Sequence, residues 1–248
     1  MESGVKEITL LGQNVNSYRA DMSFASLISA IAALEGDFII RFMTSHPKDV
    51  SDELIEAMRK YRGKIAPCFH LPLQAGSDRI LKDMNRTYTT AHYLSIVEKL
   101  RAAVPDIVLT TDIIVAFPGE TEEDFLGTLS LIERVEYDMI FSFIFSPREG
   151  TRAARMEDLI TEEEKNDRMA RLLALQREIA LKKNLSYLDR TERILVDSEA
   201  REGEGNYIGR TAGGKLVRFT DRESRIGQFI NVKITKATPF DLFGEAIQ

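Results

Sequence analysis

Short apolar runs alternate with segments of helical spacing along the first two thirds of the chain. Ile113-Ile114-Val115 is apolar and β-branched throughout, which predicts a buried strand of a parallel sheet. Ala116-Phe117-Pro118-Gly119 ends this run, because proline fixes φ and glycine admits conformations that other residues avoid. Thr121, followed three residues later by Asp124, then predicts a helix N-terminus with a capping-box partner. The unit is therefore strand, tight turn and helix.

The same unit recurs about every 30 to 35 residues, the size of a βαβ element. This spacing predicts an α/β fold with parallel strands. Strands are expected at Glu7–Leu11, Phe38–Met43, Pro67–Leu73, Val108–Val115 and Met139–Phe145. Helices are expected at Phe24–Leu34, after the cap Ser51, at Asp78–Met84 after the cap Ser77, at Tyr93–Ala103 and at Phe125–Val135.

The pattern changes after a long helix that Thr161 and Glu164 open as a capping box and that runs to about Asn184. Beyond it, short strand-like runs are separated by Gly, Asp, Arg and Ser, which predicts a small antiparallel β-barrel or sandwich. We place the boundary near Leu185. Residues 1–184 are expected to form one domain and residues 185–248 a second.

Composition limits the setting of the protein. The 248 residues are 44% hydrophobic and 29% charged, which suits a packed core under a water-exposed surface. No apolar run approaches the roughly 20 residues that a membrane helix needs, so no membrane partner is expected. The single cysteine, Cys68, excludes an intrachain disulfide and points to a reducing, cytoplasmic setting. One cysteine also cannot complete a cysteine-rich zinc or iron–sulfur site.

Net charge is −6, which argues against a protein that coats nucleic acid uniformly. From Ser186 onward, ten basic residues balance ten acidic ones, so the whole deficit lies in the first part. A local basic face on the second part therefore remains open.

Polar residues follow the predicted strands in succession. Turns at strand ends are often polar, since Asn and Ser favour loops in any protein. Parallel strands, however, would gather these side chains around one pocket, and an arginine among them can hold a carboxylate or a phosphate. We therefore expect a ligand site. Its candidates are Gln13 with Asn14, Ser45 with His46, Gln74, Asp112, and Ser146 with Arg148.

Other chemistry has weaker support. The three histidines are far apart in the sequence, so no zinc site is expected. Cys68 fits a buried strand position better than a nucleophile, because free cysteine packs as a small hydrophobe. Asp112 and Glu120 could form an acid–base pair, but their spacing across a turn sets no distance between them.

Five motifs in order resemble the radical-SAM methylthiotransferases, and most closely the tRNA enzymes that methylthiolate C2 of an isopentenylated adenosine beside the anticodon. The segment that follows the long helix resembles the TRAM domain of that family, a small RNA-binding β-barrel. The five motifs are Leu10–Tyr18, Arg41–Pro47, His70–Ser77, Thr111–Asp124 and Phe145–Ala154, and the TRAM-like stretches are Gly209-Arg210 and Ile226–Thr235.

The resemblance implies a partial radical-SAM (β/α) barrel, here lacking its first strand, that positions S-adenosylmethionine on a [4Fe-4S] cluster. It implies that Gly12 and Gln13 hold the amino group of the cofactor and that Gln74 and Asp112 contact its ribose and carboxylate. Ser45, His46 and Arg148 would then line the substrate side. The partner is expected to be tRNA, and we expect a monomer. Arg210, Lys215 and Arg218 would contact the RNA, with the aromatic residues Tyr207 and Phe219 between them.

Two departures from the family matter. The Cys-x-x-x-Cys-x-x-Cys motif of the radical cluster and three further cysteines are missing, so we expect a fragment that is inactive alone. Ala116 stands where the family usually has glycine. Two alternatives stay open: a methylthiotransferase that modifies an aspartate of a ribosomal protein, and a non-catalytic RNA-binding protein.

Overall fold

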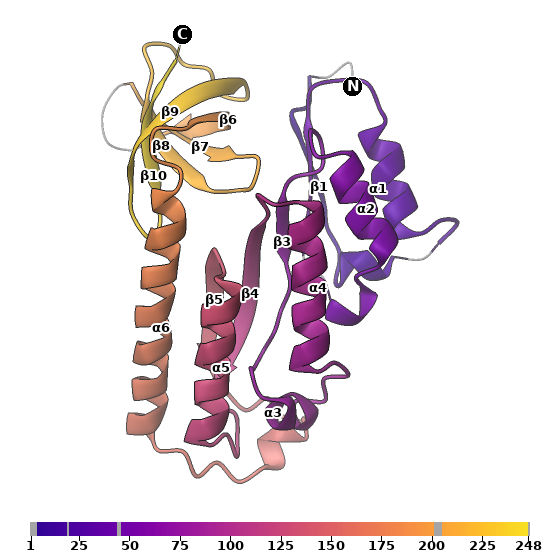
Figure 1. Ribbon diagram of the computed structural model, residues 1–248, viewed down its shortest axis with the longest axis vertical. Helices are drawn as coiled ribbons and strands as arrows, with labels where there is room; N and C mark the ends of the chain where they lie inside the picture. The colour runs from indigo at the N-terminus through magenta and orange to yellow at the C-terminus, as the bar shows by residue number, and fades with distance from the viewer. Residues whose placement is uncertain (1–3, 19, 44–45, 201–204, 248) are drawn as a thin grey trace.

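The computed structural model describes residues 4–18, 20–43, 46–200 and 205–247, and Figure 1 shows their arrangement. Five strands of the first part are β1 (Glu7–Leu10), β2 (Ile39–Phe42), β3 (Cys68–His70), β4 (Val108–Val115) and β5 (Met139–Ile144). The helices are α1 (Phe24–Ala32), α2 (Asp52–Lys60), α3 (Asp78–Asp83), α4 (Thr90–Ala103), α5 (Glu122–Val135) and α6 (Glu162–Leu185). Three short 3-10 turns lie at Val15–Ser17, Pro47–Asp49 and Ala153–Arg155.

The five strands run parallel in the order β1-β2-β3-β4-β5. Ladders join β1 to β2 and β3 through β5, and a bridge from Ile40 to Ile65 connects the two groups. The Ile40 amide donates to the Lys64 carbonyl (2.8 Å), and its carbonyl accepts from the Ala66 amide (2.9 Å). Helices cover one face of this sheet (Figure 1). The predicted α/β fold with a partial barrel is confirmed.

The predicted helix starts are largely correct. Thr121 and Thr161 each form a capping box, with Asp124 and Glu164 respectively. The exception is α4, which begins at Thr90 rather than at Tyr93. Ser77 occupies the N-cap position of α3 as predicted, but its hydroxyl makes no cap bond and donates instead to the carboxylate of Asp124 (2.6 Å). A partner distant in sequence has replaced the local cap.

The C-terminal part is a closed barrel of β6 (Thr191–Glu199), β7 (Asn206–Thr211), β8 (Leu216–Thr220), β9 (Phe229–Ala237) and β10 (Leu242–Ala246). The predicted barrel is confirmed, with one difference: β10 pairs with β8 in parallel, whereas the other pairs are antiparallel. Tyr207 and Phe219 stack on each other inside it, with ring centroids 5.9 Å apart.

The barrel packs against the amino ends of the parallel strands (Figure 1). Arg41 on β2 is 6% exposed and crosses this junction. Its guanidinium donates to the carbonyls of Thr211 (2.9 Å) and Ala212 (2.8 Å) in the β7–β8 turn, and to the carboxylate of Glu7 (2.7 Å). A Cβ placed on Gly213 of the same turn would lie 2.6 Å from a methyl group of Val108, so any larger residue there would have to displace Val108.

A second buried contact involves Lys215. Its ammonium donates to Asn184 at the end of α6 (2.8 Å) and pairs with Asp138 just before β5 (2.8 Å). Asp138 also pairs with Lys183 (2.6 Å). Burial lowers the pKa of Lys215, and the attraction of Asp138 opposes that shift. This buried contact therefore ties the barrel to the end of α6 and to the start of β5.

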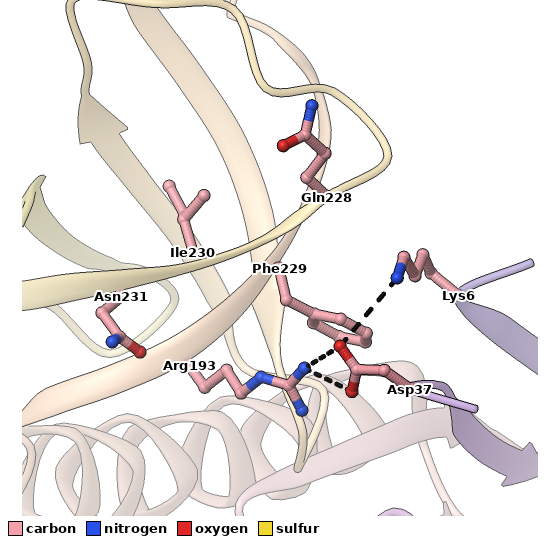
Figure 2. A pocket seen from close by; sticks show the side chains of 7 residues that line it. All are labelled: Lys6, Asp37, Arg193, Gln228, Phe229, Ile230 and Asn231. Carbon is pink, nitrogen blue, oxygen red and sulfur yellow. Dashed lines mark hydrogen bonds and ion pairs between the residues drawn. The ribbon is translucent and has the colours of Figure 1, made fainter. Parts of the chain in front are cut away.

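A shallow groove of about 290 Å³ runs along the outer edge of the junction (Figure 2). Arg193 of β6 reaches Asp37, which precedes β2, with both oxygens 2.6 Å away. The same guanidinium lies 3.9 Å from the ring centroid of Phe229. Charge pairing and stacking thus join the two parts here at the surface, where such pairs add little to stability.

Arg41→Met should lower the free energy of unfolding by about 3 kcal/mol, because two carbonyls and a carboxylate lose a buried, charged donor. Chemical denaturation followed by circular dichroism measures this change. Arg59→Met is the matched control, since Arg59 pairs with Glu56 on the exposed surface of α2 and its loss should leave the midpoint unchanged. Equal midpoints for the two variants would contradict a stabilising role for Arg41.

Candidate functional site

A cleft of about 920 Å³ opens at the carboxyl ends of β4 and β5, at the opposite end of the sheet from the barrel. Four of the residues singled out in the sequence line it together, namely Gln74, Asp112, Ser146 and Arg148. The remaining lining residues are Asp83, Met84, Asn85, Arg86, Ile114, Phe117, Phe143, Ile144, Phe145, Thr151, Arg152 and Ala153.

Alternation along β4 turns Asp112 toward the cleft. Thr111, Ile113 and Val115 are fully buried under the helices, and Asp112 and Ile114 face the other way. The Asp112 carboxylate lies 3.6 Å from Nε2 of His70, whose Nδ1 is 2.9 Å from the hydroxyl of Thr110. About 30% of the Asp112 side chain remains exposed, so its carboxylate can still receive a donor from a ligand.

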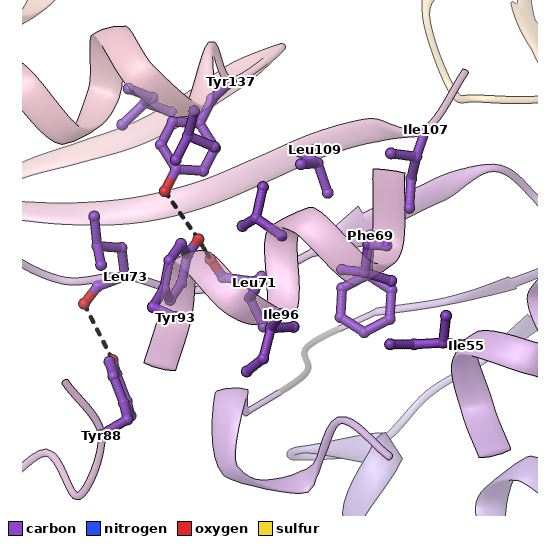
Figure 3. Close-up of a cluster of buried hydrophobic side chains, with 14 of the residues drawn as sticks. Ile55, Phe69, Leu71, Leu73, Tyr88, Tyr93, Ile96, Ile107, Leu109 and Tyr137 are labelled. Atoms are coloured by element: carbon purple, nitrogen blue, oxygen red, sulfur yellow. Dashed lines mark hydrogen bonds between the residues drawn. The ribbon is translucent and has the colours of Figure 1, made fainter. Parts of the chain in front are cut away.

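Buried hydroxyl groups hold the segment Leu71–Leu73, which directly precedes Gln74 in the chain (Figure 3). The Leu71 carbonyl accepts from Tyr93 (2.7 Å) and Thr111 (2.8 Å), and Tyr137 donates to the Tyr93 oxygen (3.0 Å). Tyr88 donates to the Leu73 carbonyl (3.1 Å). These bonds satisfy an extended segment that has no regular ladder there, and they hold it against β4.

Burial keeps these hydroxyl groups protonated. It raises the pKa of Tyr88 to about 12 and raises the pKa of Tyr93 and Tyr137 as well. The donors that hold the Leu71–Leu73 backbone therefore persist through the neutral and mildly alkaline range.

Three residues at or beside the cleft have strained backbone conformations. Gln74, Asn85 and Ala116 all have positive φ (75°, 58° and 57°), which residues with a Cβ rarely adopt. The positive φ of Ala116 gives a physical reason for glycine at this place in the resembling family. Such outliers persist only where the surrounding structure holds them.

Glu120 holds the turn at Ala116 from behind. Its carboxylate accepts from the Ala116 amide (2.8 Å) and from Arg168 of α6 (2.9 Å), and it is 4% exposed. Burial raises its pKa, against the effect of both donors. Glu120 does not line the cleft, so the structure does not bring it together with Asp112 as an acid–base pair.

Arg86 is a cleft residue that the sequence reasoning missed. Its Nε is buried and has no hydrogen-bond partner, which leaves a charged donor unsatisfied at the cleft wall. Asn85, in the left-handed conformation after α3, sets the direction of the chain into Arg86. An asparagine just beyond the C-cap Met84 was the available signal, since asparagine tolerates this conformation.

The other predicted residues lie outside the cleft lining. Gly12 and Gln13 follow β1 in an exposed loop. The amide and carbonyl of His46 pair with the side chain of Asn16 (3.1 and 3.2 Å), which ties the loops after β1 and β2 together. Burial, followed by the nearby Arg86 and Lys48, lowers the pKa of His46. Ser45 lies outside the described residues. All four assignments stay predictions.

The residues predicted to contact RNA differ in their exposure to solvent. Arg210 forms two hydrogen bonds with Asp197 (2.8 and 3.1 Å), and Arg218 pairs with Asp241 (2.7 Å); both arginines remain partly exposed and stay predictions. Lys215 is committed to the junction with Asp138 and is 9% exposed. Tyr207 and Phe219 face the interior, so they cannot stack on bases.

Metal-ligating side chains do not gather in the described part of the chain, where no group of three His, Cys, Asp or Glu residues was found. Cys68, on β3, is 3.8 Å from Arg41, and burial raises its pKa. No described helix is both long and apolar enough to cross a bilayer.

Comparison with known proteins gives two matched domains. Residues 1–132 match the Radical SAM superfamily and residues 185–247 match the TRAM domain. The tRNA-2-methylthio-N(6)-dimethylallyladenosine synthase of Clostridium botulinum (strain Langeland / NCTC 10281 / Type F) is 49% identical over 251 residues, which cover 100% of this chain and 56% of that protein. The synthase of the same name from Thermoanaerobacter sp. (strain X514) is also 49% identical, with 100% and 53% covered.

This chain thus spans about half the length of the curated relatives it matches. Among solved structures, coproporphyrinogen III oxidase from Escherichia coli, described as a Radical SAM enzyme, superposes with a TM-score of 0.51. It shares 14% sequence identity, and the match covers 90% of this chain and 56% of that one, which supports the fold. With the matched domain over more than half its length, the chain belongs to the Radical SAM superfamily.

Proposed function

We propose that this chain is part of a tRNA methylthiotransferase that adds a methylthio group to C2 of an N6-isopentenylated adenosine beside the anticodon. The observation that carries the proposal is the cleft, where Gln74, Asp112 and Arg86 converge beside an apolar wall of Ile114 and Phe143. The relatives named above, which match along the whole chain, support the same substrate.

The cleft fits S-adenosylmethionine. Its polar side offers an amide, a carboxylate and the unsatisfied Nε of Arg86, and its apolar side offers flat surface for an adenine. We assign the Asp112 carboxylate and the Gln74 amide to the ribose hydroxyls, and the Arg86 guanidinium to the methionyl carboxylate. Arg148 and the predicted residues Ser45 and His46 would lie toward the substrate, with Gly12 and Gln13 toward the amino group.

S-adenosylmethionine bound to an iron–sulfur cluster supplies the radical chemistry of this superfamily. The residues present do not fit the cluster itself, because the chain has one cysteine and a [4Fe-4S] cluster needs several cysteine ligands. Cluster ligands would have to come from outside this sequence. The role of these 248 residues is then to bind, orient and shield the cofactor and to hold the RNA.

Deletion of the gene should remove the methylthio group from tRNA and leave the N6-isopentenylated adenosine to accumulate. Mass spectrometry of tRNA nucleosides from wild-type and deletion strains measures both species. Unchanged tRNA together with loss of a methylthio group from a ribosomal protein would overturn the proposal in favour of the aspartate-modifying alternative.

Arg86→Gln should weaken binding of S-adenosylmethionine by about tenfold to a hundredfold, because a charge-assisted hydrogen bond to the carboxylate is lost. Calorimetry on the chain alone measures the affinity. The decarboxylated analogue should bind wild type and variant equally well. Arg152→Gln, at the same cleft, is the control for its general positive charge, and an equal loss there would contradict a specific contact.

Anaerobic treatment of the purified chain with iron and sulfide should give no stable iron–sulfur cluster, since a three-cysteine site cannot form from Cys68 alone. Visible absorption and iron analysis measure incorporation. Stoichiometric iron that survives gel filtration would show that the chain does contain a cluster site.

A further inference from the structure

One face of the barrel presents aromatic rings beside cations on three neighbouring strands. Phe243 of β10 is directly paired with Arg218 of β8 on one side and with Lys236 of β9 on the other. Phe240, in the turn between β9 and β10, is 69% exposed. We call these four residues the β10 face (strands in Figure 1).

Contacts within the face keep the rings and charges together. The Lys236 ammonium lies 5.4 Å from the centroid of Phe243, within the range of a cation–π contact. Arg218 pairs with Asp241, next to Phe240 in sequence, so the turn that carries Phe240 is tied to β8. Within this turn, the amides of Phe240 (3.3 Å) and Asp241 (3.0 Å) donate to the hydroxyl oxygen of Thr238, which fixes the shape of the turn.

An exposed phenylalanine flanked by cations on a five-stranded barrel has the chemistry of a surface for unpaired nucleotides. Bases stack on aromatic rings, and neighbouring lysine and arginine side chains meet the phosphates. The aromatic residues expected for this purpose, Tyr207 and Phe219, are buried in the barrel, and Lys215 is buried at the junction. The β10 face carries both the aromatic rings for base stacking and the cations for phosphate contacts on the outer surface of the barrel.

We propose that the β10 face binds unpaired RNA nucleotides, with bases on Phe240 and Phe243 and phosphates on Arg218 and Lys236. The proposal rests on the proposed function, which identifies RNA as the partner. The RNA contact is thereby assigned to exposed residues of the barrel instead of the buried Tyr207, Phe219 and Lys215.

The face is separate from the cleft. Val108, at the start of β4, lies against the barrel turn at Gly213, and Ile114, near its end, lines the cleft. Eight residues of extended strand span about 23 Å from first to last. Changes on the β10 face should therefore alter RNA affinity and leave cofactor affinity in the cleft unchanged.

The test measures fluorescence anisotropy of a labelled RNA hairpin with the sequence of a tRNA anticodon arm, bound by the full chain. Phe240→Ala and Phe240→Leu should each weaken binding about tenfold, since both remove the aromatic surface and leucine keeps the apolar bulk. Lys236→Ala should reduce the slope of log affinity against log salt by about one between about 50 and 200 mM.

Matched controls are Leu126→Ala and Lys60→Ala, at exposed positions of α5 and α2. Neither should change the affinity. Thermal melting confirms folding, and Phe240 is exposed enough that its replacement leaves the core intact. A fully paired RNA duplex should bind more weakly and should not respond to Phe240→Ala, because its bases are stacked already.

Three results would be decisive against the proposal. Hairpin binding that is equal in wild type and all β10-face variants would place the RNA contact elsewhere and leave the proposed function standing. Recovery of affinity in Phe240→Leu would indicate a general apolar contact, as a protein partner makes. No binding of the hairpin by the wild-type chain would remove RNA as a partner of this part and would count against the proposed function as well.

Discussion

The parallel direction of all five strands decides where everything else in this protein lies. Every carboxyl end opens at one edge of the sheet, and every amino end at the other. The cleft uses the first edge, because loops that leave the strands there converge. The barrel uses the second, where Arg41 of β2 donates to the carbonyls of Thr211 and Ala212 and where Lys215 of the barrel pairs with Asp138 just before β5. The two working surfaces are separated by the length of the sheet.

Residues next to the cleft owe their conformations to groups outside it. Gln74 follows a segment whose carbonyl oxygens accept hydrogen bonds from Tyr93 of α4 and from Tyr88, which precedes α4. Ala116 is held by Glu120, and Glu120 by Arg168 of α6. A ligand in the cleft would therefore meet a surface that is already ordered, which reduces the entropic cost of binding.

Local pattern was enough for most of the fold. Strand positions, the capping boxes at Thr121 and Thr161, and the change of texture after α6 all follow from neighbours in sequence. The sequence neighbours do not show which side chains point into the barrel. Tyr207, Phe219 and Lys215 alternate with exposed residues, and only the closed barrel shows that these three are buried. The hydroxyl contact of Ser77 and the place of Arg86 in the cleft wall were not predicted for a related reason, because they depend on Asp124 and on other residues distant in the chain. The proposed domain boundary near Leu185 stays a prediction.

The long helix α6 has a mechanical consequence. Arg168 near its start holds the turn behind the cleft, and Asn184 near its end contacts Lys215 and the Thr238 carbonyl of the barrel. Sixteen residues of α-helix rise about 24 Å between these two anchor points. An α-helix resists compression, so α6 fixes the distance between the cleft and the barrel. Any ligand that contacted both the cleft and the barrel would therefore have to span this fixed distance.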